Sequence, residues 1–270
     1  MKKIGFLGLG VMGLPMALNV LKKSGYPVLG FDVAQARLDQ FAAAGGETTS
    51  DPVDIYKTCD VIMQMLPTHP IIINSIKQAV QYGKPGNIIL DLDSTAPDII
   101  QELYPEVEAA GMHLLDSPVS GGNPMAIAGT LAIMTGGDKA VFEEVKPLLE
   151  CMGHPVYTGG SASGSITKLG NNMVAGAYLS AIAEGYAFAA KAGIDLQTTF
   201  DATRCGFAGG PLYDNKVPKI IHRDYEPGAR IAVHLKDIHN AKHFAHKLGV
   251  DTPVTDVTMQ IMEWMGDNGY

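Results

Sequence analysis

The 270-residue chain has few cysteines, few arginines and few charged residues, and each shortage excludes a class of protein. Its three cysteines, Cys59, Cys151 and Cys205, lie far apart, so neither a disulfide framework nor a zinc site of paired cysteines is predicted. A net charge of -8 disfavours nucleic acid as a partner, because phosphate backbones require clustered lysine and arginine. Hydrophobic residues make up 46% and charged residues 18%, which excludes a disordered chain and indicates a folded, soluble protein.

An apolar stretch near the amino terminus imitates a secretory signal peptide. Lys2 and Lys3 precede a mainly apolar run over residues 4–21, which is the order found in such peptides. However, glycines interrupt the run and no small-residue cleavage site follows, so a strand, a turn and a helix are the better interpretation. We therefore expect a cytoplasmic protein without a membrane segment.

Two patterns divide the chain. Up to about residue 160, short apolar runs alternate with helix-like stretches, which is typical of a parallel sheet with helices on both faces. From about residue 163 the strand signals stop, and residues 166–192 predict one long helix that is apolar on every side and therefore buried. The prediction is an α/β domain over residues 1–163, followed by an all-helical domain over residues 164–270 that is joined to it through the long helix.

The expected strands cover residues 3–7, 28–31, 61–65, 88–92, 114–115, 131–134 and 156–157. The expected helices of the first domain cover residues 13–24, 34–44, 52–58, 70–81, 97–110 and 139–152. After the long helix, further helices are expected over residues 196–204, 211–221, 229–248 and 253–265.

A glycine motif at the start of the chain predicts a dinucleotide site. Its residues, which follow an expected strand and open an expected helix, are Gly8, Leu9, Gly10, Val11, Met12 and Gly13. Gly8 permits a tight turn, Gly10 lets a pyrophosphate approach the backbone, and Gly13 lets the helix pack closely. Asp32 ends the next strand 19 residues after Gly13, where a carboxylate binds the ribose hydroxyls. We therefore predict a Rossmann-type domain.

Asp32 favours NAD as the cofactor, because its charge would repel the 2′-phosphate of NADP. Arg37 lies five residues further on and could meet that phosphate if the loop folded back, so NADP stays as the less favoured alternative. A glycine-rich turn that binds no ligand is the other alternative.

A second glycine-rich segment, residues 116–122, follows an expected strand in the middle of the chain. In open α/β sheets the ligand crevice lies at the carboxyl ends of the strands, so this loop should border the nicotinamide. The hydroxyl of Ser120 and the N–H groups of Gly121 and Gly122 can hold a substrate carboxylate. An ordinary turn is the alternative.

Lys168 lies at the start of the long apolar helix, and Asn172 follows four residues later on the same face. An amine and an amide in a helix of mainly apolar and small residues are costly unless they have partners, so the pair indicates a functional site. A solvated lysine with a buried stem is the alternative. Asn171, one position round the helix, serves packing or capping instead.

These motifs occur in the order found in the β-hydroxyacid dehydrogenase family, which the chain resembles over nearly its whole length. The resemblance rests on the 8–13 motif with Met16, Ala17 and Asn19, the 116–122 loop with Ala126 and Gly129, Lys168 with Asn171 and Asn172, and Lys236, Asp237 and Ile238 with Ala241. It implies a Rossmann-type domain, an all-helical domain for substrate binding and oligomerisation, and a site between them. A homodimer or homotetramer is also implied.

The resemblance further implies roles for individual residues. Lys168 matches the catalytic lysine, Asn172 a substrate-binding amide, and Lys236 the lysine near the nicotinamide, where substrate and cofactor meet. The matches to the loop that holds the substrate carboxylate are Ser120, Gly121 and Gly122. Those to residues that line the cofactor are Pro67 and either Ser94 or Thr95. Two positions depart from the family, which usually has glycine at Ala162 and often an aromatic residue at Ala229.

The implied reaction is the reversible oxidation of a 3-hydroxy acid, such as 3-hydroxyisobutyrate, to its semialdehyde or keto acid. Lys168 would act as general acid and base if burial, the positive nicotinamide and Lys236 lower its pKa from about 10.4. Alternatives are reduction of a semialdehyde such as tartronate semialdehyde, of glyoxylate or of an imine. A non-catalytic NAD-binding module is a further alternative, although such a module needs no amine at this place.

Other candidate sites have less support. His239, His243 and His246 share one helix face, but no carboxylate completes a known metal spacing, so no metal is predicted. Arg204 and Arg230 could bind a second acidic group of the substrate, although surface positions are the simpler expectation. Acidic residues that we expect at helix starts or on the surface are Asp51, Asp54, Glu143, Glu144 and Asp237.

Overall fold

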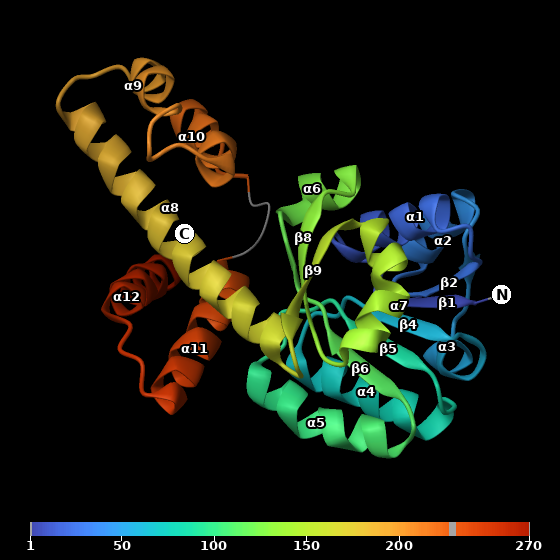
Figure 1. The fold of residues 1–270 in the computed structure, drawn as a ribbon. Helices are drawn as coiled ribbons and strands as arrows, with labels where there is room; N and C mark the ends of the chain where they lie inside the picture. The colour runs from blue at the N-terminus through green and yellow to red at the C-terminus, as the bar shows by residue number, and fades with distance from the viewer. Residues whose placement is uncertain (1, 227–230, 270) are drawn as a thin grey trace. The chain divides into compact units, whose positions relative to one another are not determined.

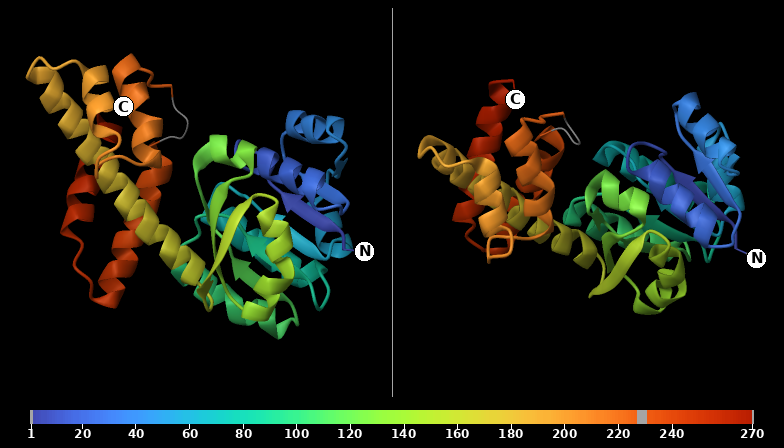
Figure 2. Two further views of the ribbon diagram at one scale, coloured as in Figure 1. Left: turned by 45° about the horizontal axis from the view of Figure 1, so that its top comes forward. Right: turned by 90° about the horizontal axis from the view of Figure 1, so that it is seen from above.

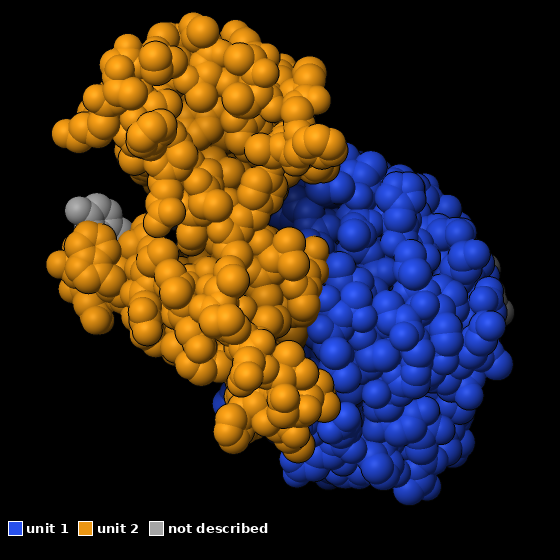
Figure 3. Space-filling model, turned by 60° about the vertical axis from the view of Figure 1, so that its left-hand side comes forward, with its two compact units in different colours: residues 1–168 blue, residues 169–270 orange. Residues whose placement is uncertain are grey.

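A computed structural model describes residues 2–226 and 231–269 of the chain. The chain divides into two compact units, residues 1–168 and residues 169–270, which Figure 3 colours separately. Helix α8 (Ser163–Lys191) begins in the first unit and continues into the second. Each unit therefore contributes part of one long helix.

Within the described residues, the first unit contains a nine-stranded sheet (Figure 1). The strands are β1 (Ile4–Leu7), β2 (Val28–Phe31), β3 (Glu47–Thr48), β4 (Val61–Gln64), β5 (Ile88–Asp91), β6 (His113–Asp116), β7 (Val119–Ser120), β8 (Leu131–Gly136) and β9 (Gly153–Gly159). They run in the order β3-β2-β1-β4-β5-β6-β8-β7, with β9 paired to β8. The first six strands pair in parallel in the order of a Rossmann fold, which confirms the predicted fold class.

One part of the sheet departs from the prediction, because β8 is antiparallel to β6 and β7. The chain leaves β6, forms the two-residue strand β7 and turns back through α6 to β8. A two-residue strand has no hydrophobic period, so the sequence does not reveal this reversal. Residues 117–122 therefore run on beyond β6, because Val119 and Ser120 continue the antiparallel pairing with β8 that Asp116 begins.

Helices cover both faces of the sheet (Figures 1 and 2). They are α1 (Gly13–Lys23), α2 (Gln35–Ala43), α3 (Pro52–Thr58), α4 (His69–Tyr82), α5 (Pro97–Ala109), α6 (Gly122–Ala128) and α7 (Lys139–Glu150). Neighbouring strand residues enter opposite cores: Leu90 packs in the core with α1, α2 and α7, and Ile89 packs in the core with α3, α4 and α5. Burial of the strands on both faces explains their unbroken apolar runs.

The second unit contains the rest of α8 with α9 (Leu196–Thr203), α10 (Pro211–His222), α11 (Ile231–Leu248) and α12 (Pro253–Asp267). One small core joins α8, α9 and α10, where the hydroxyl of Tyr213 lies 2.6 Å from those of Tyr186 and Thr203. A second core packs Leu169 of α8 against α11. All described elements of this unit are helices, as predicted.

The prediction that α8 is buried is wrong for the single chain. Val174 is 70% exposed and Phe188 77% exposed. Among the described residues, α8 is the one helix whose length and hydropathy would suit a membrane span, a property shared by long core helices of soluble proteins. The helix therefore presents apolar side chains that the chain itself leaves uncovered.

Candidate functional site

The turn between β1 and α1 is as tight as its glycines suggest. A methyl group on Gly8, where φ is +89°, would lie 2.2 Å from the carbonyl oxygen of Met65. One on Gly13 would lie 1.9 Å from the carbonyl oxygen of Gly8. At Gly10, by contrast, no described atom lies within 4 Å of that position, so a ligand can approach the backbone. No described side chain caps the start of α1, whose N–H groups can therefore bind a pyrophosphate.

Asp32, just after β2, is tied to the same turn. Its Oδ2 accepts a hydrogen bond from the N–H of Leu9 at 2.7 Å, and its Oδ1 accepts one from the N–H of Ala34 at 2.8 Å. Each carboxylate oxygen has a further lone pair. The side chain is only partly buried, so those lone pairs can receive the hydroxyls of a ribose.

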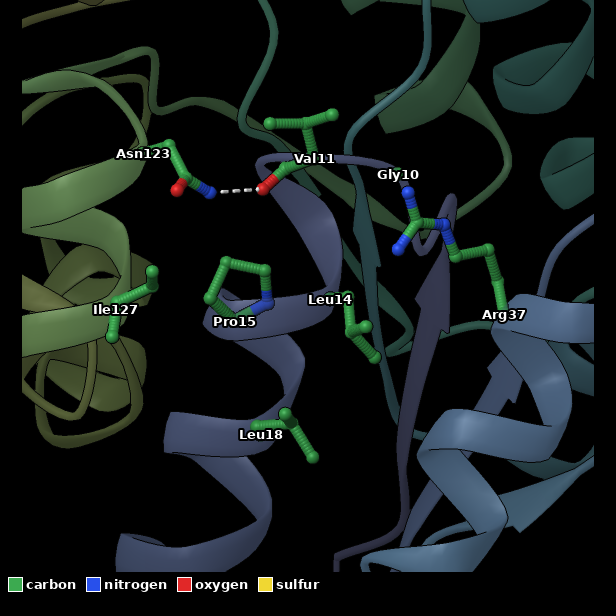
Figure 4. A pocket seen from close by; sticks show the side chains of 8 residues that line it. All are labelled: Gly10, Val11, Leu14, Pro15, Leu18, Arg37, Asn123 and Ile127. Carbon is green, nitrogen blue, oxygen red and sulfur yellow. Dashed lines mark hydrogen bonds between the residues drawn. The ribbon is translucent and has the colours of Figure 1, made fainter. Parts of the chain in front are cut away.

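A cavity of about 320 Å³ lies beside the turn, and Figure 4 shows the residues that line it. They are Gly10, Val11, Leu14, Pro15, Leu18, Arg37, Asn123 and Ile127. Arg37 and Gly10 both line this cavity, and Nη1 of Arg37 donates to Oε1 of Gln40 at 3.1 Å. A guanidinium at this place can bind a phosphate, so the alternative cofactor NADP has a structural basis as well.

The segment after β6 is fixed against the glycine turn. Nδ2 of Asn123, at the start of α6, donates to the carbonyl oxygen of Val11 at 2.7 Å (Figure 4). Nδ2 of Asn19 on α1 donates to the carbonyl oxygen of Ala126 at 2.8 Å. These two bonds place the 120–122 loop beside the dinucleotide turn. They also explain why Asn19 and Ala126 accompany the two glycine motifs in the family resemblance, because the bond between these two residues joins α1 to α6.

The glycines of the 120–122 loop adopt conformations that other residues avoid. Gly121 has φ +139° and Gly122 has φ +68°. A methyl group on Gly121 would also lie 2.6 Å from the sulfur of Met125. Ser120 pairs with Ala132 across β7 and β8, which fixes its register. The loop thus offers a hydroxyl and two N–H groups from a constrained backbone, which suits a carboxylate ligand.

The loops after β4 and β5 carry the other cofactor candidates. Pro67 is exposed in the loop after β4. Ser94 is partly exposed after β5, whereas Thr95 is 1% exposed. The sequence left Ser94 and Thr95 as equivalent candidates, and their exposures favour Ser94 as the one that a ligand can reach.

Lys168 and Asn172 lie four residues apart on α8 and share one face of that helix. Lys168 is 8% exposed and Asn172 is 6% exposed. Asn171, one position round, donates from Nδ2 to Oδ1 of Asn172 at 3.1 Å. Both candidate side chains are therefore nearly inaccessible, and Asn171 supports its neighbour.

Asp237 on α11 is buried, although the sequence predicted a charge at a helix start or on the surface. It was expected at the surface, but it is 3% exposed. Its Oδ2 accepts a hydrogen bond from Nδ2 of Asn172 at 2.7 Å, and its Oδ1 lies 3.3 Å from Nζ of Lys236. The missed signal is helical spacing, because Asp237 shares a face with the buried residues Ala241 and Phe244. Asp237 thus orients the amide of Asn172 and neutralises Lys236.

The arginine candidates contribute less. Arg204 lies with its guanidinium carbon 4.9 Å from the centre of the Phe200 ring, and Nη2 lies 3.5 Å from Oδ1 of Asp214. These contacts support the surface role that the sequence favoured. Arg230 and Ala229 lie outside the described residues.

The histidine face of α11 is partly paired, since Nε2 of His239 lies 2.9 Å from Oε1 of Glu263. The described residues contain no group of three or more side chains that could hold a metal ion. Among the acidic residues, Asp51 is a helix cap as expected, because its Oδ1 accepts a hydrogen bond from the N–H of Val53.

Two protein-family models match the chain. That of the NAD-binding domain of 6-phosphogluconate dehydrogenase matches residues 3–160, and that of the NAD-binding domain of NADP-dependent 3-hydroxyisobutyrate dehydrogenase matches residues 162–270. Together the two matches account for nearly the whole chain.

Individual relatives match with similar coverage. The chain is 32% identical to 2-hydroxy-3-oxopropionate reductase of Escherichia coli (strain K12), over 99% of the chain and 92% of the relative. It is 30% identical to an NAD-dependent L-serine dehydrogenase of Pseudomonas aeruginosa, over 100% of the chain and 94% of the relative. Among solved structures, 3-hydroxyisobutyrate dehydrogenase of Mycobacterium tuberculosis with L-serine superposes with a TM-score of 0.89 at 30% identity, covering 99% and 94% of the two chains.

Asp237→Asn should lower the free energy of unfolding by about 1–3 kcal/mol, because the buried amide of Asn172 loses a charged acceptor. The matched control is Asp256→Asn, which breaks a surface pair between Asp256 and Lys242 and should cost less than about 1 kcal/mol. Urea unfolding of both variants checks this. Equal losses of unfolding free energy in the two variants would show that Asp237 contributes no more to stability than a surface charge does.

Proposed function

The chain belongs to the β-hydroxyacid dehydrogenase family, and we propose that it reversibly oxidises a 3-hydroxy acid to the corresponding semialdehyde or keto acid. As a family member it is an NAD(P)-dependent dehydrogenase that acts on hydroxyl groups. The observation that carries the proposal is the 8% exposure of Lys168 near the start of α8. A nearly inaccessible amine needs specific surroundings, so a role in catalysis accounts for it better than a solvated position does.

NAD fits the residues at the carboxyl edge of the sheet. The open space at Gly10, the uncapped start of α1 and the carboxylate of Asp32 suit a pyrophosphate and a ribose. Pro67 and Ser94 would line the remainder of the cofactor. When bound, NAD takes up the hydride from the carbon that is oxidised.

The substrate is proposed to bind through its carboxylate. The hydroxyl of Ser120 and the N–H groups of Gly121 and Gly122 would hold the carboxylate, while the amide of Asn172 would bind the substrate's polar groups. Lys236 would add a positive charge near substrate and cofactor, with Asp237 limiting the net charge. Residues 1–163 thus serve as the cofactor domain in this proposal, and residues 164–270 as the domain for substrate binding and oligomerisation.

Lys168 performs the proton transfer in this proposal. Nζ of Lys168 removes the proton from the substrate hydroxyl during oxidation, and in the reverse direction it returns a proton to the carbonyl oxygen. The amine must therefore lose its proton before oxidation and carry one before reduction.

Reduction of a semialdehyde is the second candidate function. The observation in its favour is the 32% identity to 2-hydroxy-3-oxopropionate reductase, which is named for reduction of tartronate semialdehyde. The same residues would serve this reaction, and glyoxylate is a further substrate of the same kind. A non-catalytic NAD-binding module is disfavoured, because it has no use for the buried amine. We also propose that the protein is located in the cytoplasm.

Lys168→Ala should lower kcat by about 10²–10⁴-fold, because the variant lacks the proposed general base. The Kd for NAD, measured by fluorescence titration, should change less than about twofold, since only the reaction loses a group. Lys191→Ala, at the exposed far end of the same helix, is the control and should retain wild-type kcat. A Lys168→Ala variant with near-normal kcat would contradict the proposed role.

Asp32→Asn should lower the preference for NAD over NADP, measured as the ratio of the two kcat/KM values, by about tenfold or more. The amide keeps an oxygen acceptor but removes the charge that repels a 2′-phosphate. Asp39→Asn, on the exposed face of α2, removes a nearby surface charge and should leave the ratio unchanged. If both variants retain the wild-type ratio, Asp32 does not select the cofactor.

A homo-oligomer is proposed from the apolar side chains on α8. Phe188→Ser should shift the mass measured by light scattering towards the monomer, because Phe188, 77% exposed in the single chain, would be covered by a second copy. Val33→Ser is the control, since Val33 is 93% exposed on the first unit. A wild-type chain that is already monomeric at micromolar concentration would refute the proposal.

A further inference from the structure

The carboxylate of Asp116 binds the start of the helix that carries Lys168. Asp116 is the last residue of β6 and is 1% exposed. Its Oδ1 accepts a hydrogen bond from the N–H of Ala162 at 3.0 Å, and its Oδ2 accepts one from the N–H of Ser165 at 2.7 Å. N–H groups at a helix start lack partners within the helix, so this one side chain satisfies two of them.

Two glycines leave room for this contact. A methyl group on Gly136 of β8 would lie 2.6 Å from Oδ1 of Asp116. One on Gly164 would lie 2.3 Å from the carbonyl oxygen of Asp116 and 3.0 Å from Oδ2. Both positions must therefore lack a side chain for the helix to reach the carboxylate.

The bond to Ala162 also holds a strained residue. Ala162 has φ +68°, a conformation in which a Cβ is crowded against the backbone. Its methyl group is fully buried in the core with α3, α4 and α5, and its N–H is bound by Asp116. Such strain persists only where the surroundings fix it, and here the packing and the carboxylate do so together.

The charge of Asp116 is costly in this place. Burial raises the pKa of Asp116 to about 6, although the N–H groups of Ser165 and Ala162 oppose the shift. Because this pKa exceeds the ordinary value of 3.8, the folded chain binds more protons between about pH 4 and 6, and stability falls as pH rises through that range. An uncharged acceptor would avoid this loss, so stability alone does not explain the carboxylate.

Asp91 and Tyr104 are titratable residues that interact electrostatically with Asp116. Asp91 lies beside it in register on β5, and its charge raises the pKa of Asp116 further. Burial raises the pKa of Asp91 as well. Burial raises the pKa of Tyr104 on α5, and nearby charges, first that of Glu108 and last that of Asp116, add to the shift. On α8 itself, Lys168 follows Ser165 by three residues, which is less than one helical turn.

We propose that Asp116 is a positioning residue: its carboxylate fixes the first turn of α8 and thereby the place of Lys168. This inference rests on the proposed role of Lys168 as general acid and base. A small displacement of a proton-transfer group has a large effect on rate, whereas cofactor binding at the β1–α1 turn does not depend on it.

Asp116→Asn tests the proposal. The variant keeps one oxygen acceptor and sets an amide N–H₂ against the other backbone N–H. We expect kcat to fall by about 10- to 100-fold, while the Kd for NAD changes less than about twofold. Asp138→Asn is the matched control, because Oδ1 of Asp138 accepts hydrogen bonds from the N–H groups of Ala140 and Val141 at the start of α7. That variant should keep wild-type kcat.

A pH profile separates positioning from a purely structural role. In the reductive direction protonated Lys168 is the donor, so its titration lowers kcat only on the alkaline side. The wild-type kcat should nevertheless also fall below about pH 6, where Asp116 takes up a proton and one helix N–H loses its acceptor. The Asp116→Asn variant should lack this acidic fall, and Asp138→Asn should retain it.

The pH profile of the wild-type kcat tests the proposal even if Asp116→Asn does not fold. A wild-type kcat that is flat below pH 6 overturns the proposal by itself. If the wild type turns over substrate but Asp116→Asn matches Asp138→Asn, the positioning role is wrong and the proposed function survives. If the wild type turns over no hydroxy acid or semialdehyde, the proposed function fails and takes this inference with it.

Discussion

The two hydrogen bonds from the start of α8 to Asp116 are the contact on which the proposed chemistry depends. They join the last strand of the parallel sheet to the helix that carries Lys168, and they require Gly136, Gly164 and the strained Ala162 around them. Through a side chain that binds backbone N–H groups, the end of β6 holds the first turn of α8. A buried charge that costs stability is retained at that junction.

The same edge of the sheet also carries the residues that we propose to bind the cofactor. Parallel strands end together, so the side chains and loops that follow them gather without any long excursion of the chain. Asp32 follows β2, Ser94 follows β5, and the 120–122 loop follows β6 and β7 before the chain turns back through α6. Asn123 then fastens the loop to the glycine turn. Proximity of these groups is thus a product of strand order.

Local patterns predicted the fold and part of the site. The 8–13 motif and its distance to Asp32 followed from spacing alone, because both depend on residues that are close together in the sequence. Other features were missed. The elements α6 and β7 are too short to show a period, and the helical spacing of Asp237 with Ala241 and Phe244, which indicates its burial, was overlooked. The exposure of α8 was also missed, since an apolar helix need not be covered by its own chain.

The most direct measurement is the initial rate with which the purified wild-type chain oxidises a panel of 3-hydroxy acids with NAD, and reduces the matching semialdehydes with NADH. Each hydroxy acid is paired with the alcohol that lacks its carboxylate. The account predicts turnover with at least one acid and its semialdehyde, and little with the paired alcohol, because the 120–122 loop binds a carboxylate. Equal rates for acid and alcohol, or no turnover with the whole panel, would contradict it.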